Sequence, residues 1–383
     1  MKTAGIIAEY NPFHSGHAWH IAKTREAGFT HIIAVMSGNV VQRGDLAILD
    51  SRSRAQAAIF GGADLVVELP PPYCCGSAKD FAAAGVHIIK CLGGVDALSF
   101  GSECGDIRSL SECADEVSQS YSGRVAEKIA QGLTYPQALA ASYPEFKDIL
   151  GGANNTLALE YLIALKGSGI SGFTVPRTAP HDTDGESSGF ASASAIRKMI
   201  LSGEPSADYR RFLLSDIDEK DVSSIADAEK AILYKLASMK ESDILNAPYT
   251  GDGIAQRLIK YRMTANSLEE LYSLVKTRNV THARVRRALL LAAIGADKRD
   301  LSSPPPYARV LAANKRGLEI LAGCKIYSSI PVSTSLAELA AASKQAERCA
   351  GLTGIASRLR YMARQGGIGG YVSEYSRRFS LTE

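Results

Sequence analysis

The sequence predicts an α/β fold, with a Rossmann-like domain built on a parallel sheet over residues 1–205 and a mainly α-helical domain over residues 206–383. In the first 200 residues, short apolar runs rich in Ile and Val alternate with helical patterns, as in strand–helix–strand units. After Gly203 such runs nearly stop and helical periodicity dominates. A chain of 383 residues is also long enough for two domains.

In the first domain, each predicted strand is an apolar run, all but the first run are closed by Gly, Ser or Pro, and each helix carries apolar residues at helical spacing. The expected strands cover residues 4–8, 32–36, 64–69, 97–100 and 172–175. The expected helices cover residues 18–26, 52–60, 81–92, 154–165 and a stretch that Ser192 or Ser194 caps and that runs to residue 202. Residues 107–143 are also expected to be helical, with apolar residues at helical spacing over 109–120 and 124–131. Residues 178–189 are polar and predict a loop, which contains His181 and Asp182.

The second domain is expected to consist of helices, with the boundary near residues 202–215. Apolar residues at helical spacing predict these helices at residues 226–237, 253–263, 267–275, 281–294, 307–321 and 336–350. The run Pro304-Pro305-Pro306 marks a linker between two of them.

Composition excludes several classes of protein. No run of about 18 apolar residues occurs, so we expect no membrane span and no membrane partner. Residues 1–8 are too short for a signal peptide and form the first predicted strand. The seven cysteines lack paired Cys-x-x-Cys spacings, which favours reduced thiols in the cytoplasm over a disulfide framework or a zinc ribbon.

Charge is distributed unevenly along the chain. Residues 1–200 hold 16 Lys/Arg and 20 Asp/Glu, a net charge of −4, whereas the remainder holds 27 and 20, a net charge of +7. Arg284, Arg286 and Arg287 lie together on one predicted helix of the basic half. A polyanion such as RNA is the partner that this half favours, and the alternative is an ordinary solvated surface.

The stretch from Glu9 to His17 is the most informative part of the sequence. It joins the first predicted strand to the first helix and contains His14-Ser15-Gly16-His17. A helix N-terminus holds phosphate through unpaired N–H groups, imidazoles can donate to phosphate oxygens, and Gly16 allows close approach. These residues predict attack on the α-phosphate of a nucleotide with pyrophosphate leaving. A plain surface turn and a metal site at His14, His17 and His20 are the alternatives, but no nearby Cys or acidic cluster completes a metal site.

A second anion site is predicted where Ser192, Ser194 and Arg197 begin a helix. The hydroxyl and N–H groups would accept phosphate, and Arg197 would neutralise the departing pyrophosphate. Gly101 follows a strand and could admit adenine or ribose, or be a plain turn. Arg177 ends another strand at the expected ligand edge and could hold a phosphate or a carboxylate.

Together, the His-x-Gly-His turn and the Ser-x-Ser-x-Ile-Arg helix resemble the HIGH-type nucleotidyltransferase superfamily. Six ordered motifs are similar, more narrowly, to the bacterial tRNA(Met) cytidine acetate ligase family. These motifs are EYNPFHSGH at residue 9, VMSG at 35, QRG at 42, DLVVELP at 64, FGSE at 100 and SASAIR at 192. The resemblance covers most of residues 1–200 and continues weakly into the helical half.

The resemblance implies that acetate and ATP form acetyl-adenylate, with Mg²⁺ on the phosphates, and that the acetyl group passes to N4 of the wobble cytidine (C34) of elongator tRNA(Met). It gives His14 and His17 the catalytic role. The implied ATP site consists of Ile7, Ala8, Glu9, Tyr10, Asn11, Pro12, Phe13, His14, Ser15, Gly16, His17, His20, Gly101, Asn154, Arg177, Ser192, Ser194 and Arg197. Asn155 competes with Asn154 for one position.

Two other functions remain open on the sequence alone. The first is an adenylyltransferase for a small cofactor precursor, although such enzymes manage without a long basic helical half. The second is a nucleotide-sensing RNA-binding protein, although the presence of both His14 and His17 disfavours a site that has lost its catalytic activity.

Overall fold

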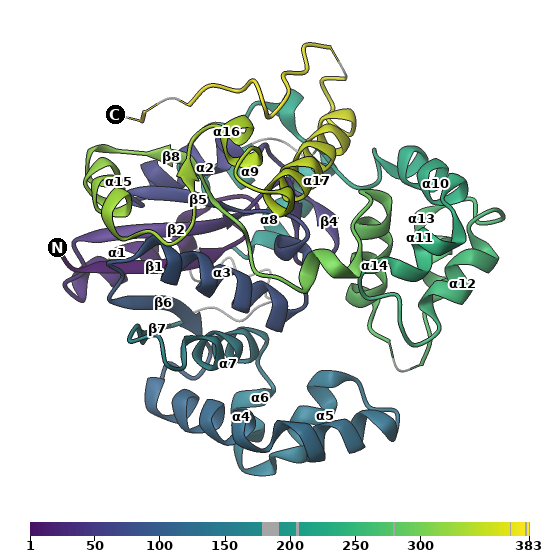
Figure 1. Cartoon of the computed structure of the whole chain (residues 1–383), viewed down its shortest axis with the longest axis horizontal. Coiled ribbons are helices and arrows are strands. Elements are labelled where there is room, and N and C mark those ends of the chain that lie inside the picture. The colour runs from purple at the N-terminus through teal and green to yellow at the C-terminus, as the bar shows by residue number, and fades with distance from the viewer. Residues whose placement is uncertain (178–190, 204–206, 279, 368, 380, 383) are drawn as a thin grey trace.

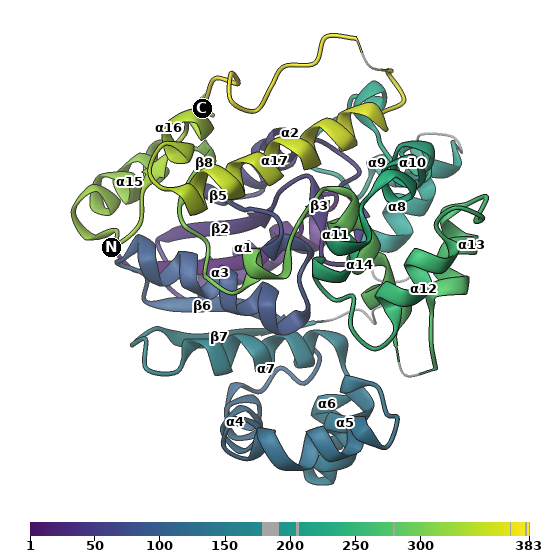
Figure 2. The same cartoon turned by 45° about the vertical axis from the view of Figure 1, so that its right-hand side comes forward.

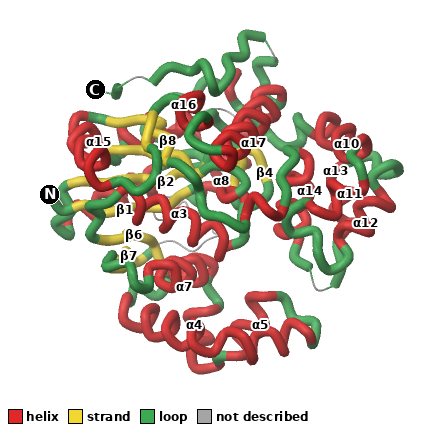
Figure 3. The backbone as a smooth tube through the Cα atoms, viewed as in Figure 1, coloured by secondary structure: helices red, strands yellow, loops and turns green. Residues whose placement is uncertain are grey.

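The computed structural model describes residues 1–177, 191–203, 207–278, 280–367, 369–379 and 381–382. A seven-stranded sheet in the order β7–β6–β1–β2–β5–β8–β9 forms its centre, and helices pack on both faces (Figures 1 and 3). The strands are β1 Thr3–Ala8, β2 His31–Ser37, β3 Val40–Val41, β4 Asp45–Leu46, β5 Leu65–Leu69, β6 Ala97–Ser102, β7 Ser171–Pro176, β8 Ala308–Ala313 and β9 Val332–Ser333.

The α-helices of the first half are α1 Ser15–Glu26, α2 Ser51–Phe60, α3 Ala78–Leu92, α4 Ile107–Ala130, α5 Tyr135–Ser142, α6 Lys147–Leu150, α7 Ala153–Leu165 and α8 Ala193–Ser202. Those of the second half are α9 Ala207–Arg210, α10 Glu229–Ser238, α11 Glu241–Asn246, α12 Ile254–Tyr261, α13 Leu268–Val275, α14 His282–Ala293, α15 Lys315–Tyr327, α16 Leu336–Ala340 and α17 Lys344–Met362. Short 3₁₀ helices cover Tyr73–Cys75, Pro144–Phe146, Glu219–Asp221 and Lys298–Leu301.

The sheet core follows from side chains that alternate between the two faces of each strand. Ile7 and Val35 point into one core with the apolar side of α3, while Ile6 and Ala34 point into another with α1 and α2. Five strands, β7, β6, β1, β2 and β5, are parallel. Their carboxyl ends therefore share one edge, where open α/β sheets bind ligands. The predicted α/β fold with a parallel sheet is confirmed.

The helix predicted over residues 307–321 is wrong in its first half. Ala308–Ala313 is strand β8, antiparallel to β5, and only Lys315–Tyr327 is helical. Every residue of β8 is buried, so the strand shows no period-two alternation, and a short apolar run of this kind cannot be told from a buried helix by its pattern. Arg309 also argues against a fully buried strand in the sequence, because a charged side chain is normally exposed, whereas here it is buried and paired with Glu68.

One further boundary differs from the predictions. The helical region expected over residues 107–143 is confirmed as α4 and α5, whereas the helix expected at 336–350 is split into α16 and α17. Ser343 caps α17, which explains the break. The loop expected at residues 178–189, with His181 and Asp182, lies outside the described residues.

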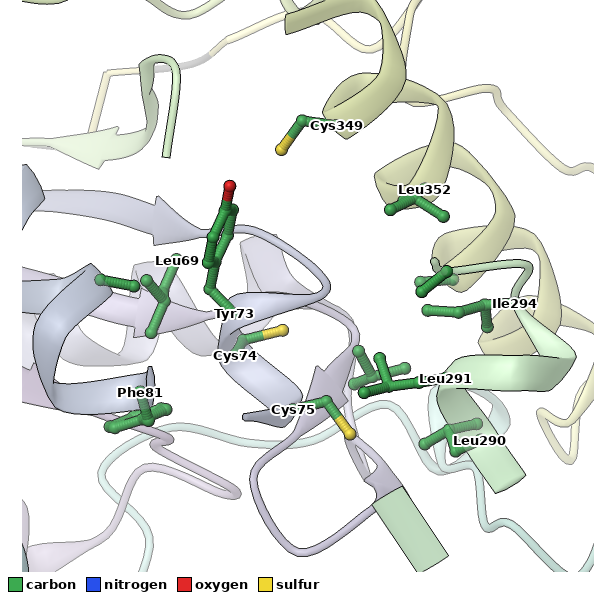
Figure 4. Close-up of a cluster of buried hydrophobic side chains, with 14 of the residues drawn as sticks. Leu69, Tyr73, Cys74, Cys75, Phe81, Leu290, Leu291, Ile294, Cys349 and Leu352 are labelled. Atoms are coloured by element: carbon green, nitrogen blue, oxygen red, sulfur yellow. The ribbon is translucent and has the colours of Figure 1, made fainter. Parts of the chain in front are cut away.

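The helical half packs against the sheet rather than standing apart from it. Helices α10–α14 lie at one end of the molecule, α4–α6 lie beyond β7, and α17 crosses above the sheet (Figures 1 and 2). Figure 4 shows Cys74 and Cys75 facing Leu291 of α14, with Leu352 of α17 nearby, and these residues belong to one buried cluster. The two halves therefore share a core, and the boundary at residue 205 stays a prediction. Across the described residues, no helix combines the length and the apolar character needed to cross a bilayer.

Candidate active site

A cavity of about 450 Å³ opens at the carboxyl ends of β1, β6 and β7. The β1–α1 turn, the N-termini of α7 and α8 and the β3–β4 hairpin complete its wall. Of the predicted ATP-site residues, the lining includes Ile7, Ala8, Glu9, Tyr10, Asn11, His14, Gly16, His17, His20, Gly101, Asn154, Arg177, Ser192 and Ser194. The structure thus brings together residues that lie up to 187 positions apart in the sequence.

Four predicted residues are not part of the lining and instead hold the turn that carries the histidines. Phe13 is buried, its ring centroid 4.9 Å from that of Tyr10, and it fills the space beside Gly61. The backbone N–H of Ser15 donates to a carbonyl of the second half, that of Phe212, at 2.8 Å. Pro12 is also buried, and Arg197 donates to the turn from α8.

His14 and His17 present neutral rings with defined tautomers. The Nδ1 atom of His14 accepts from the N–H of Gly16 at 3.0 Å, and Nδ1 of His17 accepts from the N–H of His14 at 3.3 Å. Burial and then the positive charges of Arg177 and Arg197 lower the pKa of His14 to about 4. Burial, followed by the charge of His14, lowers the pKa of His17 well below its usual range. Both rings are therefore neutral at pH 7, and because each Nδ1 accepts, each Nε2 carries the proton and can donate.

His20 offers the cavity the opposite kind of group. Its Nε2 lies 2.9 Å from Oγ of Ser99, which lies 2.7 Å from Oγ1 of Thr24. The Thr24 hydroxyl donates its one proton to the carbonyl of His20, so Ser99 donates to Thr24 and Nε2–H of His20 donates to Ser99. Burial and then Arg177 lower the pKa of His20 to about 4, which keeps the ring neutral and leaves Nδ1 as an acceptor. His20 thus suits a ligand hydroxyl or amino group rather than a phosphate oxygen.

The N-terminus of α8 forms the wall next to the histidine turn. Ser192 caps the helix, its Oγ accepting from the N–H of Ala195 at 3.1 Å. Ser194 Oγ accepts from Arg197 at 3.1 Å and from Arg43 of the β3–β4 hairpin at 2.8 Å. The N-terminus of α8 and two guanidinium groups therefore gather at one place, which is the composition of an anion site.

The structure distinguishes Asn154 from Asn155. Asn154 lines the cavity, and its Oδ1 lies 3.4 Å from Nη1 of Arg177. Asn155 is buried, and its Oδ1 accepts from the backbone N–H groups of Glu103 at 2.9 Å and Cys104 at 3.3 Å. Asn155 therefore holds the turn after β6, and Asn154 is the residue able to meet a ligand.

Sequence reasoning missed Arg43 as a site residue and most of the apolar wall of the cavity. That wall consists of Ile6, Trp19, Ala78, Phe81, Phe100, Leu157, Tyr161 and Val175. Apolar residues at these places in helices and strands look like core residues in a sequence, so no local signal marks them. The QRG motif was the one available pointer to Arg43.

The three arginines predicted to bind tRNA have partners within the chain. Arg284 pairs with Asp252 at 2.6 Å, and Arg286 lies 3.7 Å from Glu269. Arg287 is partly buried over the ring of a tyrosine and donates to the carbonyl of Gln42 at 3.4 Å. Their role in tRNA binding stays a prediction.

Comparison with known proteins matches this geometry to a family. The model described as "HIGH Nucleotidyl Transferase" matches residues 1–365. A protein from Acetivibrio thermocellus named "tRNA(Met) cytidine acetate ligase" is 33% identical over 370 residues, which covers 88% of this chain and 89% of that protein. One from Thermoanaerobacter pseudethanolicus with the same name is 36% identical over 362 residues, which covers 88% and 90%.

Solved structures share the fold. The structure of Thermotoga maritima TmcAL bound with alpha-thio ATP (Form II) superposes with a TM-score of 0.87 at 24% identity, covering 100% of both chains. The apo form I of the same protein gives a TM-score of 0.87 at 25% identity, covering 97% of both chains.

Proposed function

The chain belongs to the tRNA(Met) cytidine acetate ligase family of HIGH nucleotidyl transferases, and from this membership we propose that it makes N4-acetylcytidine in tRNA. Acetate attacks the α-phosphorus of ATP, the bond to pyrophosphate breaks, and acetyl-adenylate forms. The N4 amine of the wobble cytidine (C34) of elongator tRNA(Met) then attacks the acetyl carbonyl, AMP leaves, and the amine loses a proton.

The observation that carries the proposal is the pair of neutral Nε2–H donors of His14 and His17 beside the α8 N-terminus. Each ring accepts a backbone N–H at Nδ1 and so keeps its Nε2–H as a donor. The two rings can therefore stabilise the negative charge that develops on the α-phosphate with no prior change in their own protonation. Ser192, Ser194 and Arg197 would stabilise the departing pyrophosphate. The acceptor of His20 and the carbonyl-rich end of β1 would bind the nucleoside.

Mg²⁺ is part of the proposal, and the residues present fit it in a limited way. Among the described residues that line the cavity, Glu9 is the one carboxylate, and its Oε1 already accepts from the N–H of Gln42 at 2.8 Å. The other Glu9 oxygen can bind a cation, so phosphate oxygens and water would supply most of the Mg²⁺ ligands. Bound there, the ion would neutralise phosphate charge.

The basic second half supports tRNA as the partner, because a net charge of +7 over residues 201–383 favours a polyanion. C34 must leave the anticodon stack to reach the adenylate in the cavity. All seven cysteines are free thiols, which supports the proposed cytoplasmic location.

Exchange of labelled pyrophosphate into ATP tests the activation step. The purified protein should catalyse acetate-dependent exchange, and His17→Ala should slow it by about 10²-fold or more, the scale of losing one transition-state donor. His282→Ala, at an exposed position on α14, is the matched control and should exchange at the wild-type rate. An unchanged rate in His17→Ala contradicts the assigned role.

A further inference from the structure

Arg43 belongs to the QRG motif, to which no role is assigned above, and it lies at the wall of the cavity. Its side chain is exposed, and its Nη1 donates to Ser194 Oγ at 2.8 Å. Arg197 donates to the same oxygen at 3.1 Å, so two cations share one neutral hydroxyl. Asp45, the acid on the same hairpin, accepts from the N–H of Leu46 at 2.8 Å through Oδ1, and its charge offsets part of the charge of Arg43 and Arg197. Two like charges held this close are offset best by an anion between them.

We propose that Arg43 binds the β- and γ-phosphates of ATP and that helix α14 of the second half holds it in that position. The proposal rests on the proposed function. Ser192 and Ser194 put the start of α8 at the same place, whereas His14 caps α1, His17 lies in the first turn of α1, and both suit the α-phosphate. Phosphate oxygens would replace Ser194 Oγ as the acceptor for Arg43 and form the stronger, charge-assisted bond.

The contact between the hairpin and α14 is tight at Gly44. Gly44 has a φ of +76°, and a Cβ added to it would lie 2.4 Å from the backbone nitrogen of Arg287. On the two sides of this contact, Gln42 donates its N–H to Glu9 at 2.8 Å and accepts from Arg287 at 3.4 Å. The turn that presents Arg43 is thus fixed between the cavity wall and the basic half. Through this contact, α14 of the basic half touches the hairpin that carries Arg43 at the proposed phosphate end of the ATP site.

Calorimetric titration of the full-length protein with ATP and with AMP measures what the β- and γ-phosphates contribute to affinity, because AMP lacks these two phosphates. Arg43→Ala should weaken ATP binding by about 10-fold or more, the effect of losing a charge-assisted bond, and leave AMP binding within about twofold. Arg316→Ala, at an exposed position on α15, is the control and should change neither. Unchanged ATP affinity, an equal loss for AMP, or a loss confined to tRNA binding overturns the assignment.

The positioning role of α14 is tested with two glycines. Gly44→Ala should reproduce the loss of ATP affinity, and adding it to Arg43→Ala should cause little further loss. Gly28→Ala carries the same left-handed strain, at φ +93°, but meets no atom within 4 Å and should bind ATP normally. If Gly44→Ala does not fold, Arg287→Met removes the donor to Gln42 and should give a smaller loss in the same direction.

Additive losses in Gly44→Ala and Arg43→Ala contradict the positioning role. A different result would identify failure of the proposed function: the wild-type protein would bind ATP but show no acetate-dependent pyrophosphate exchange.

Discussion

The guanidinium group of Arg197 donates to the backbone carbonyl of Asn11 at 2.6 Å. This bond ties α8 to the turn that carries His14 and His17, across 186 positions of sequence. Asn11 is itself buried, and its side-chain Oδ1 accepts from the N–H of Ile48 at 2.8 Å. The two motifs proposed to bind phosphate therefore meet at one cavity because a side chain of α8 is bonded to the backbone of the histidine segment, and substitutions at either should act on the same ligand.

Substitutions of the neighbours Asn154 and Asn155 should have different effects, one on ATP binding and the other on the free energy of unfolding. Asn155→Ala leaves two backbone N–H groups of the turn after β6 without their acceptor, so it should cost about 1–3 kcal/mol of unfolding free energy. Asn154→Ala should leave stability nearly unchanged and weaken ATP binding. Urea unfolding and ATP titration of both variants check this, and the reverse pattern would show that the assignment of the two residues is inverted.

Acid should destabilise the fold through His20. Its native pKa of about 4 lies below the unfolded value near 6.5, so between these values the unfolded chain binds a proton that the native ring does not. Stability is fully present above about pH 6.5 and falls as the pH drops toward 4. His20→Asn lacks this titration and should lose less stability between pH 7 and pH 5 in urea unfolding. An equal loss in both proteins would contradict the buried neutral ring.

The C-terminal segment should contribute strongly to stability through Glu374. This carboxylate is buried, lies 2.7 Å from Nη2 of Arg309 and accepts from Ser357 at 2.9 Å. Glu374→Ala leaves the fully buried Arg309 with Glu68 as its remaining carboxylate partner, and should cost about 3–5 kcal/mol. Glu319→Ala removes the contact between Glu319 and His31, in which the carboxylate is 64% exposed, and should cost less than about 1 kcal/mol. Similar denaturation midpoints for the two variants would refute the difference.

Binding to tRNA should depend on Arg284 and Arg286, which are 31% and 43% exposed, more than on the packed Arg287. Replacing both with alanine should weaken tRNA binding and lower the slope of log affinity against log salt by about 0.7–0.9 for each phosphate that the variant no longer neutralises. Acetate-dependent pyrophosphate exchange should be retained. Filter binding over a salt series measures the slope, and an unchanged slope places the tRNA elsewhere on the basic half.

Sequence patterns predicted those parts of the structure that depend on local chemistry. The buried parallel strands read as apolar runs, and the His-x-Gly-His turn and the capped start of α8 carry their signals within a few residues. Parallel strands also bring their carboxyl ends to one edge, which is why Gly101 and Arg177 could be placed near the histidines.

The remaining features depend on contacts between distant segments. Strand β8 is specified by its pairing with β5 and by the ion pair between Arg309 and Glu68, 241 positions apart. The position of Arg43 depends on how Gly44 meets α14, and no local pattern encodes that contact. The choice between Asn154 and Asn155 likewise required the backbone of residues 103–104.

The most direct test of the central claim is mass analysis of the nucleosides of elongator tRNA(Met). An unmodified transcript is incubated with the purified protein, ATP, Mg²⁺ and isotope-labelled acetate, and the nucleosides are then separated. The proposed function predicts labelled N4-acetylcytidine at position 34, formed only with ATP and lost in His17→Ala. Intact cytidine at position 34, in a preparation that exchanges pyrophosphate with acetate, would contradict it.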